Sequence, residues 1–513
     1  IGGNKVKKIR LLFVAFGGFL LITSLLITSM VSAAPTSQIV IALDTDVPTM
    51  DPHRHAERAG VIVNWHNFDS LFFRQYDMKI VPSLAKSYEV VNPTTVVLRL
   101  REDVKFHNGE PFNAQVVKFS LERVLDPKTK SPRITSLQWL KSVEIVDEYT
   151  VRLNFKYPYP IWQEELQNLA MVPPKYIKEK GDEYFAEHPV GTGPYKFVKW
   201  VRGQEIVMTA NEEYFKGAPH IKKVIFKIIP DPSTRFAALL AGKIDLLRNI
   251  SPEEIPILEA NKNIKVYTVP ILRFGWIYFY DALNPDSPFY DKRVRQALNY
   301  AVNIPEIIKE VIYGLGTPTV VLNPLHFGYD PEVKPYPYDP AKAKELLSEA
   351  GFPNGFSFTC HYTTANAIKV DEVMQAIQSQ LAKVGVKMKL QKWSPVGYME
   401  LIDGGRARPA FYLNWGSFGV FDGDAILFPF FRSGQRYAFF HTPELDKLID
   451  QERVEMNPEK RKQLMSKIQR ILREEAPWIF NYAFHTTVAA NAKLDYKPRS
   501  DEMYYAYEIG LKE

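Results

Sequence analysis

Aromatic residues, glycines and carboxylates are concentrated between Ala410 and Ser433, in the string AFYLNWGSFGVFDGDAILFPFFRS. The run that ends at Trp415 is predicted to be a strand, and the glycines that follow it keep the next loop open. An aromatic wall with a few polar groups suits a concave site for a small ligand, while a packed loop is the alternative. The candidate binding residues in this segment are Trp415, Ser417, Phe418, Asp422 and Asp424.

The residue types of enzyme active sites and metal centres do not form a recognisable pattern. The chain has no His-Glu-x-x-His, Gly-x-Ser-x-Gly or Cys-x-x-Cys motif. The one cysteine, Cys360, cannot form an internal disulfide and is predicted to be a buried thiol. His53 and His55 stand two residues apart in a predicted loop, where such a pair is more often solvated than metal-bound. We therefore expect no catalytic residue, no metal site and no cofactor.

A strand followed by two helices is predicted from Trp276 to Gly316. The run Ile264–Leu272 and the aromatic run Trp276–Tyr280 each favour a strand, and Arg273 lies between them. A guanidinium there could hold a carboxylate or phosphate with two hydrogen bonds, or pair with a neighbouring acid. Asp291 and Asn303 are predicted to cap the two helices. The apolar face of the first helix comprises Val294, Ala297, Leu298 and Ala301.

The charge of the chain does not point to a nucleic acid as its partner. The formal net charge is +6, and four of the positive charges lie before residue 35, where there is no acid. The remaining sequence has no basic stripe, which a nucleic-acid-binding surface would require. A hydrophobic content of 46% and a charged content of 24% are typical of globular proteins.

The N-terminus has the pattern of a secretory signal peptide. A basic start is followed by an apolar run from Leu11 to about Ile27 and then by the small residues of Val31-Ser32-Ala33-Ala34. This order favours cleavage after Ala33 or Ala34 and a periplasmic location. The run is long for a signal core, so an uncleaved membrane anchor is the alternative. The cleavage zone contains no cysteine, so a lipoprotein anchor is not expected.

Several separated strings point to one protein family. PFYDKRVRQALNYAVNIPEII resembles the signature of the extracytoplasmic solute-binding proteins of family 5, which serve ABC importers for peptides, nickel and related solutes. The block Leu100–Pro127, the Gly-Thr-Gly-Pro-Tyr loop at Gly191 and the segment Asp231–Leu246 also resemble that family. The resemblance extends from Ile39 past Phe480.

The resemblance implies an α/β fold of the two-lobe periplasmic binding protein kind, type II, in the large cluster with an extra subdomain. A hinge would join the lobes, and the chain would pass between them between Val269 and Phe274. Ligand would bind between the lobes, and the closed form would dock on an ABC permease with its ATPase. A monomer that makes and breaks no bond is expected. The implied division is 1–34 signal peptide, 35–75 with 190–270 and 484–513 domain I, 76–189 subdomain II, and 271–483 domain III.

The resemblance also adds candidate site residues. The family turns the strand ends and loops that hold Asp46, Trp65 and Trp276 toward its cavity. In its peptide-binding members, the string that follows the corresponding strand resembles Trp-x-x-Asp-Tyr-x-Asp-Pro. The first Asp of that string holds the amino terminus of the peptide. Trp415 matches the Trp, but Phe418 stands where that Asp would be. This departure weakens the case for a free peptide with an ammonium end, although Asp422 or Asp424 could supply the charge.

Two other functions stay open at this point. A metal or metal-chelate carrier of the same family would need histidines such as His66 or His441 to meet at the cleft. An extracytoplasmic hydrolase would need a nucleophile or an acid pair. For a solute carrier, oligopeptides, opines, sugars and amino sugars are all compatible with the sequence.

Overall fold

The computed structural model describes residues 37–365, 367–416 and 419–512. The N-terminal segment, with its predicted signal peptide or anchor, lies outside these residues. In the part of the chain that is described, no helix combines the length and the apolar character needed to cross a bilayer.

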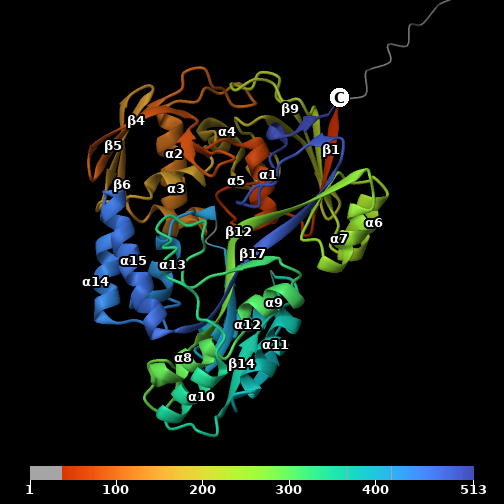
Figure 1. Cartoon of the computed structure of the whole chain (residues 1–513). Coiled ribbons are helices and arrows are strands. Elements are labelled where there is room, and N and C mark those ends of the chain that lie inside the picture. Colours follow the sequence, from red (N-terminus) through yellow and green to blue (C-terminus); the bar gives the residue numbers. More distant parts are fainter. Residues whose placement is uncertain (1–36, 366, 417–418, 513) are drawn as a thin grey trace, which may run out of the picture. The chain divides into compact units, whose positions relative to one another are not determined.

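Two long antiparallel strands, β12 (Ile264–Phe279) and β17 (Trp478–Asn491), run side by side (Figure 1). Both are rich in β-branched and aromatic residues, which fit the pleated backbone of a sheet. The sequence predicts two separate strands in the region of β12, but the structure has one continuous strand. Its register against β17 shifts between Pro270 and Phe274 and again between Phe274 and Trp276. The ladder is therefore irregular where the passage between lobes is predicted.

These two strands belong to an eleven-stranded mixed sheet in the order β15-β14-β16-β12-β17-β11-β1-β10-β9-β8, and β13 also pairs with β17. On one side of the pair, β14 runs parallel to β15 and β16, and on the other side β1 runs parallel to β10 and β11. The remaining strands of this sheet are β1 (Gln38–Leu43), β8 (Tyr195–Val201), β9 (Glu205–Ala210), β10 (Lys223–Ile228), β11 (Leu246–Arg248), β13 (Gly316–Pro318), β14 (Ser357–Tyr362), β15 (Lys387–Lys392) and β16 (Ala410–Trp415).

A separate antiparallel sheet has the order β4-β5-β7-β6, and α2 (Ala114–Leu125) packs against it. Asn113 caps α2 by accepting hydrogen bonds from the backbone of Gln115 and Val116. The strands of this sheet are β4 (Ala85–Asn92), β5 (Thr95–Leu100), β6 (Leu140–Asp147) and β7 (Thr150–Phe155). Two small sheets consist of β2 (Phe72–Arg74) with β3 (Ile80–Pro82), and β18 (Leu494–Asp495) with β19 (Gly510–Leu511).

The two helices predicted after the aromatic strand are confirmed as α8 and α9. The side chain of Asp291 accepts a hydrogen bond from the backbone N–H of Arg293, and that of Asn303 accepts one from Glu306. The other helices, apart from α2, are α1 (Arg58–Asn67), α3 (Trp162–Gln167), α4 (Pro174–Lys180), α5 (Asp182–Phe185), α6 (Pro232–Leu240), α7 (Ile255–Glu259), α10 (Pro340–Glu349), α11 (Val370–Ala382), α12 (Pro395–Asp403), α13 (Asp424–Phe431), α14 (Pro443–Glu452) and α15 (Pro458–Glu475). Here α8 spans Lys292–Tyr300 and α9 spans Ile304–Glu310.

The buried apolar side chains of the described residues form several clusters. The largest draws its members from residues 269–484, and another draws them from residues 71–171 with the addition of Val420. A third cluster joins residues near the start, the middle and the end of the chain, from Ile39 to Ile509. Segments from the start, the middle and the end of the chain therefore pack into one core.

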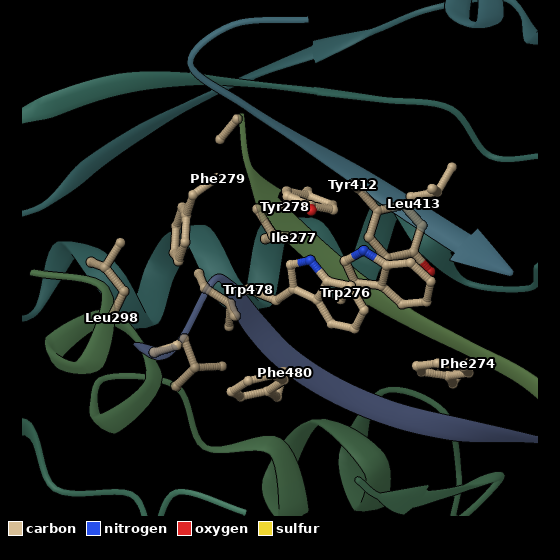
Figure 2. Packing of buried hydrophobic residues seen from close by; sticks show 14 of the residues in the cluster. Phe274, Trp276, Ile277, Tyr278, Phe279, Leu298, Tyr412, Leu413, Trp478 and Phe480 are labelled. Carbon is tan, nitrogen blue, oxygen red and sulfur yellow. The ribbon is translucent and has the colours of Figure 1, made fainter. Parts of the chain in front are cut away.

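Aromatic rings fill the centre of the largest cluster (Figure 2). The indoles of Trp276 and Trp478 are stacked, with ring centroids 4.3 Å apart, and both side chains are fully buried. Trp276 also meets Phe430 edge to ring at 5.2 Å. Such arrangements add to the free energy gained by removing large apolar surfaces from water. Trp276, a candidate for ligand contact on sequence grounds, is thus placed inside the core.

Replacing Trp276 with alanine is expected to lower the free energy of unfolding by about 3–5 kcal/mol, because it leaves a large cavity beneath β12. Denaturant unfolding followed by tryptophan fluorescence and circular dichroism measures the change. Tyr290→Ala is the control, because that ring is 54% exposed and its loss should change stability by no more than about 0.5 kcal/mol. A Trp276→Ala protein as stable as the control would contradict a packing role for this indole.

Candidate ligand-binding cavities

Two adjoining cavities lie beside β12. The first has a volume of about 490 Å³ and the second about 740 Å³. Glu57, Arg58 and Arg273 line both, so the cavities meet at these three side chains. Each volume falls within the range of about 300–1,000 Å³ that is usual for small-molecule sites.

Aromatic side chains from distant elements line the first cavity. Trp65 comes from α1, and Trp415 is the last residue of β16, where it pairs in register with Phe274 of β12. The Trp415 ring packs edge to ring on Phe430 at 5.3 Å, and the Trp65 ring lies 6.3 Å from that of Phe73. Both indoles are half-buried, so each presents part of its surface to the cavity. The structure therefore brings together two of the predicted candidates.

A cluster of three guanidinium groups around one carboxylate marks the place where the cavities meet. The carboxylate of Glu502 lies 3.2 Å from Arg58, 3.6 Å from Arg248 and 3.8 Å from Arg273. Burial alone would raise the pKa of Glu502, but the three arginines outweigh burial and hold that pKa below its ordinary value. Arg273 thus lines both cavities and is engaged with an acid, which is one of the two roles that the sequence left open; the role of holding a ligand anion stays a prediction.

Arg133 is a cavity residue that the sequence did not single out. It precedes the short 3₁₀ turn Ile134–Leu137, and its Nε donates a hydrogen bond to the backbone carbonyl of His55 at 3.3 Å. Among residues 37–365, 367–416 and 419–512, no carboxylate lies within ion-pair distance of its guanidinium. Burial lowers the pKa of Arg133. No local pattern in KSPRITSLQWL separates this arginine from other basic residues, so only the fold reveals it.

Asp422 and Asp424 belong to a buried ionic network and do not line either cavity. Both carboxylate oxygens of Asp422 accept hydrogen bonds from Arg461, at 2.6 and 2.7 Å. Arg461 also donates to Glu452 at 3.0 Å, and Asp424 lies 3.3 Å from Arg453. Burial is the largest influence on Asp422 and raises its pKa despite the arginine. These acids anchor the loop that follows β16, which explains why they are not turned toward the cavities.

The other predicted site residues are placed as follows. Asp46 accepts hydrogen bonds from the indole N–H of Trp200 at 3.0 Å and from the backbone N–H of Gly203 at 2.7 Å, and it lines neither cavity. Ser417 and Phe418 lie outside the described residues. Gly416 and Gly419 line the first cavity.

The histidine predictions require a correction. The prediction that His53 and His55 are solvated is wrong, because both are buried and hydrogen-bonded. Burial lowers the pKa of each to about 4. His66 is also buried, where it bonds to the Ile62 carbonyl and accepts from the Ala506 N–H, and His441 lines neither cavity. No group of three or more potential metal ligands occurs within the part of the chain that the structure describes.

The buried network predicts a large cost for removing its central cation. Arg461→Met would leave Asp422 and Glu452 buried without their partner, which is expected to destabilise the protein by about 3–5 kcal/mol. Arg470→Met is a matched control on the same helix, because the Arg470 side chain is 56% exposed in its pair with Asp330 and should contribute no more than about 1 kcal/mol. Thermal and urea unfolding compare the two variants. Equal stabilities would show that the network does not hold the loop.

Comparisons with known proteins agree on one family. The sequence profile of the bacterial extracellular solute-binding proteins, family 5 (middle), matches residues 79–438. The glutathione-binding protein GsiB of Escherichia coli O1:K1 is 31% identical over 462 residues, which cover 87% of this chain and 89% of that protein.

Solved structures give the same result. The periplasmic binding protein DppA from Helicobacter pylori, in complex with the peptide STSA, is 26% identical with a TM-score of 0.77, covering 93% of this chain and 98% of that one. NikZ from Campylobacter jejuni, in complex with Ni(L-His), is 27% identical with a TM-score of 0.79, covering 93% and 100%. The predicted fold class, that of type II periplasmic binding proteins, is confirmed. The chain belongs to family 5 of the bacterial extracellular solute-binding proteins, the substrate-binding components of ABC importers.

Proposed function

We propose that this protein captures a small peptide-like solute with at least one carboxylate in the first cavity and delivers it to an ABC permease with its ATPase. The observation that carries the proposal is Arg133, a cation on the cavity wall with no ion-pair partner among the described residues. A carboxylate of the cargo would supply the missing charge and accept two parallel hydrogen bonds.

The other arginines of the first cavity are already engaged. Arg74 forms an ion pair with Glu164, and Arg58 and Arg273 share Glu502. An anion that approached these three would compete with an ion-paired acid of the protein, whereas no acid of the described residues is ion-paired with Arg133. Arg133 is therefore the preferred anchor for an anionic group.

Glu57 provides a place for a positive charge on the same cargo. Its side chain is 64% exposed and lines the first cavity. The nearest basic group is the ring of His55 at 3.7 Å, which is neutral at pH 7 because burial lowers the pKa of His55 to about 4. An ammonium group could thus pair with Glu57, which would take over the role that the Asp missing at Phe418 has in peptide-binding members. A zwitterionic cargo fits the names of the relatives, which bind glutathione and a tetrapeptide.

The indoles of Trp65 and Trp415 would cover the uncharged part of the cargo. A flat aromatic surface accepts planar amide groups and apolar side chains without a strict sequence requirement. We further infer that the protein works as a monomer in the periplasm after removal of residues 1–34, and that it leaves the cargo unaltered. The three-domain division with a hinge near β12 is part of this proposal and agrees with the separate apolar clusters.

A metal chelate is the second candidate cargo, because the chain resembles NikZ in complex with Ni(L-His). In that case the carboxylate of the chelating histidine would pair with Arg133, and the metal would be held by the chelator. The same arginine would then serve either cargo, and only the choice of solute would differ.

The test begins with mass spectrometry of solute released from freshly purified protein. Isothermal titration with reduced glutathione, the peptide Ser-Thr-Ser-Ala and nickel with excess histidine then separates the candidate cargoes. Arg133→Gln is expected to weaken the binding of a carboxylate cargo by about 1.5–3 kcal/mol, or roughly 10- to 150-fold.

Arg152→Gln is the matched control, because this exposed arginine pairs with Glu144 on the separate four-stranded sheet. An uncharged released solute, or equal affinity in the two variants, would rule out anion capture at Arg133. Cargo that is recovered with an altered mass would instead support a hydrolase.

A further inference from the structure

Glu165 lies directly behind the wall of the first cavity. It belongs to α3, and its carboxylate accepts a hydrogen bond from the hydroxyl of Tyr159 at 3.3 Å and lies near the hydroxyl of Ser136. Ser136 itself lines the cavity, as do Gln167 and Asn168, which follow Glu165 in the chain. One side chain therefore separates this carboxylate from the space that the cargo would occupy.

The charges that face Glu165 come from several elements. Arg133 precedes the 3₁₀ turn that holds Ser136, and it is the cation whose charge Glu165 opposes. On the acidic side are Glu164 of the same helix, which is paired with Arg74, and Asp424 of α13, which is paired with Arg453. Glu165 itself has no lysine, arginine or histidine within ion-pair distance in the described portion of the chain.

The balance of these influences places the titration of Glu165 near neutrality. Burial is the largest influence and raises the pKa of Glu165 to about 7, against the opposing hydrogen bonds of Ser136 and Tyr159. Asp424 and Glu164 raise the pKa further. The nearby His55 does not titrate in the same range, because burial lowers its pKa to about 4. The phenol of Tyr159 stays protonated, because burial raises its pKa as well.

We propose that Glu165 tunes the affinity of the cavity for an anion by gaining and losing a proton. This inference rests on the proposed capture of a carboxylate at Arg133. When Glu165 is neutral, only Glu57 opposes the positive charge of Arg133, and the arginine attracts the cargo more strongly. When Glu165 is ionised, its negative charge cancels part of that attraction. A carboxylate bound at Arg133 in turn favours the neutral form of Glu165, so binding near neutral pH takes up a proton.

The direction of the pH dependence follows from this linkage. Affinity for an anionic cargo should be highest below the pKa of Glu165 and should fall as the pH rises through about 7. Stability has the same sign, because a carboxyl group with a raised pKa holds more protons in the folded than in the unfolded protein. The contribution of Glu165 to stability is therefore lost as the pH rises from the ordinary pKa of a glutamate through about 7.

The first experiment needs no cargo. The free energy of unfolding of the full chain is measured from pH 4.5 to 8.5 for the wild type, Glu165→Gln, Arg133→Gln and the double variant. The difference between proteins with and without Glu165 reports its titration. Removal of Arg133 should shift that titration to higher pH, because a cation that favours the carboxylate is lost. A titration that is unchanged without Arg133 would overturn the inference, whatever the cargo is.

The second experiment measures binding of reduced glutathione between pH 5.5 and 7.5 by titration calorimetry in two buffers of different ionisation enthalpy. The carboxylates of glutathione are ionised throughout this range and its thiol stays protonated, since thiols have a pKa of about 8.5. The wild type should bind about threefold to tenfold more weakly at the upper pH and should take up a fraction of a proton. Glu165→Gln should bind with nearly constant affinity and without that proton.

Glu144→Gln controls for the loss of a carboxyl group, because the exposed Glu144 pairs with Arg152 and neither residue lines the cavity. The same pH profile in the wild type and in Glu165→Gln would overturn the inference and leave the capture of a carboxylate intact. If glutathione binds neither the wild type nor any variant at any pH, glutathione is not the cargo. The ligand-free titration then decides the role of Glu165.

Discussion

The pairing of β12 with β17 is the interaction on which the other parts of the structure depend. The two strands pair from Ile264 to Pro270 and again from Phe274 to Tyr278, with register shifts between Pro270 and Trp276, and through them both sides of the large sheet are joined. The stacked indoles of Trp276 and Trp478 hold the strands together at one end of this ladder. Because Arg273 lies in the irregular part of β12, the same pairing places it where the two cavities meet.

Much of the fold could be predicted from the sequence, because it depends on residues that are close together in the chain. Capping residues such as Asp291 and Asn303 and the apolar spacing of α8 act within one helix, so their effects can be predicted without tertiary contacts. Long matching strings then identified the family, and the comparisons confirm it. The single strand β12 was predicted as two, because it continues through the stretch between Pro270 and Phe274, where its register against β17 shifts.

The residues that line the cavities could be predicted only in part from the sequence, because burial and charge pairing are properties of the folded chain. An aromatic residue such as Trp276 looks the same in sequence whether it contacts cargo or fills a core. Asp422 was a reasonable candidate until Arg461, which lies 39 residues away in the chain, proved to hold it. Arg133 and Glu57 were missed for the opposite reason, since neither forms an ion pair with an oppositely charged residue among those described, apart from the contact of Glu57 with the His55 ring. The position of Glu165 behind Ser136 is likewise set by tertiary packing alone.

The sharing of Arg461 between Asp422 and Glu452 has a consequence for how this sequence can diverge. No member of the trio can be exchanged for an apolar residue alone without stranding an opposite charge away from water. Loss of the arginine would have to accompany loss of both acids, so the three positions should change in concert or not at all. Natural variants that alter the specificity of the neighbouring loop would therefore be drawn from substitutions that spare its anchor.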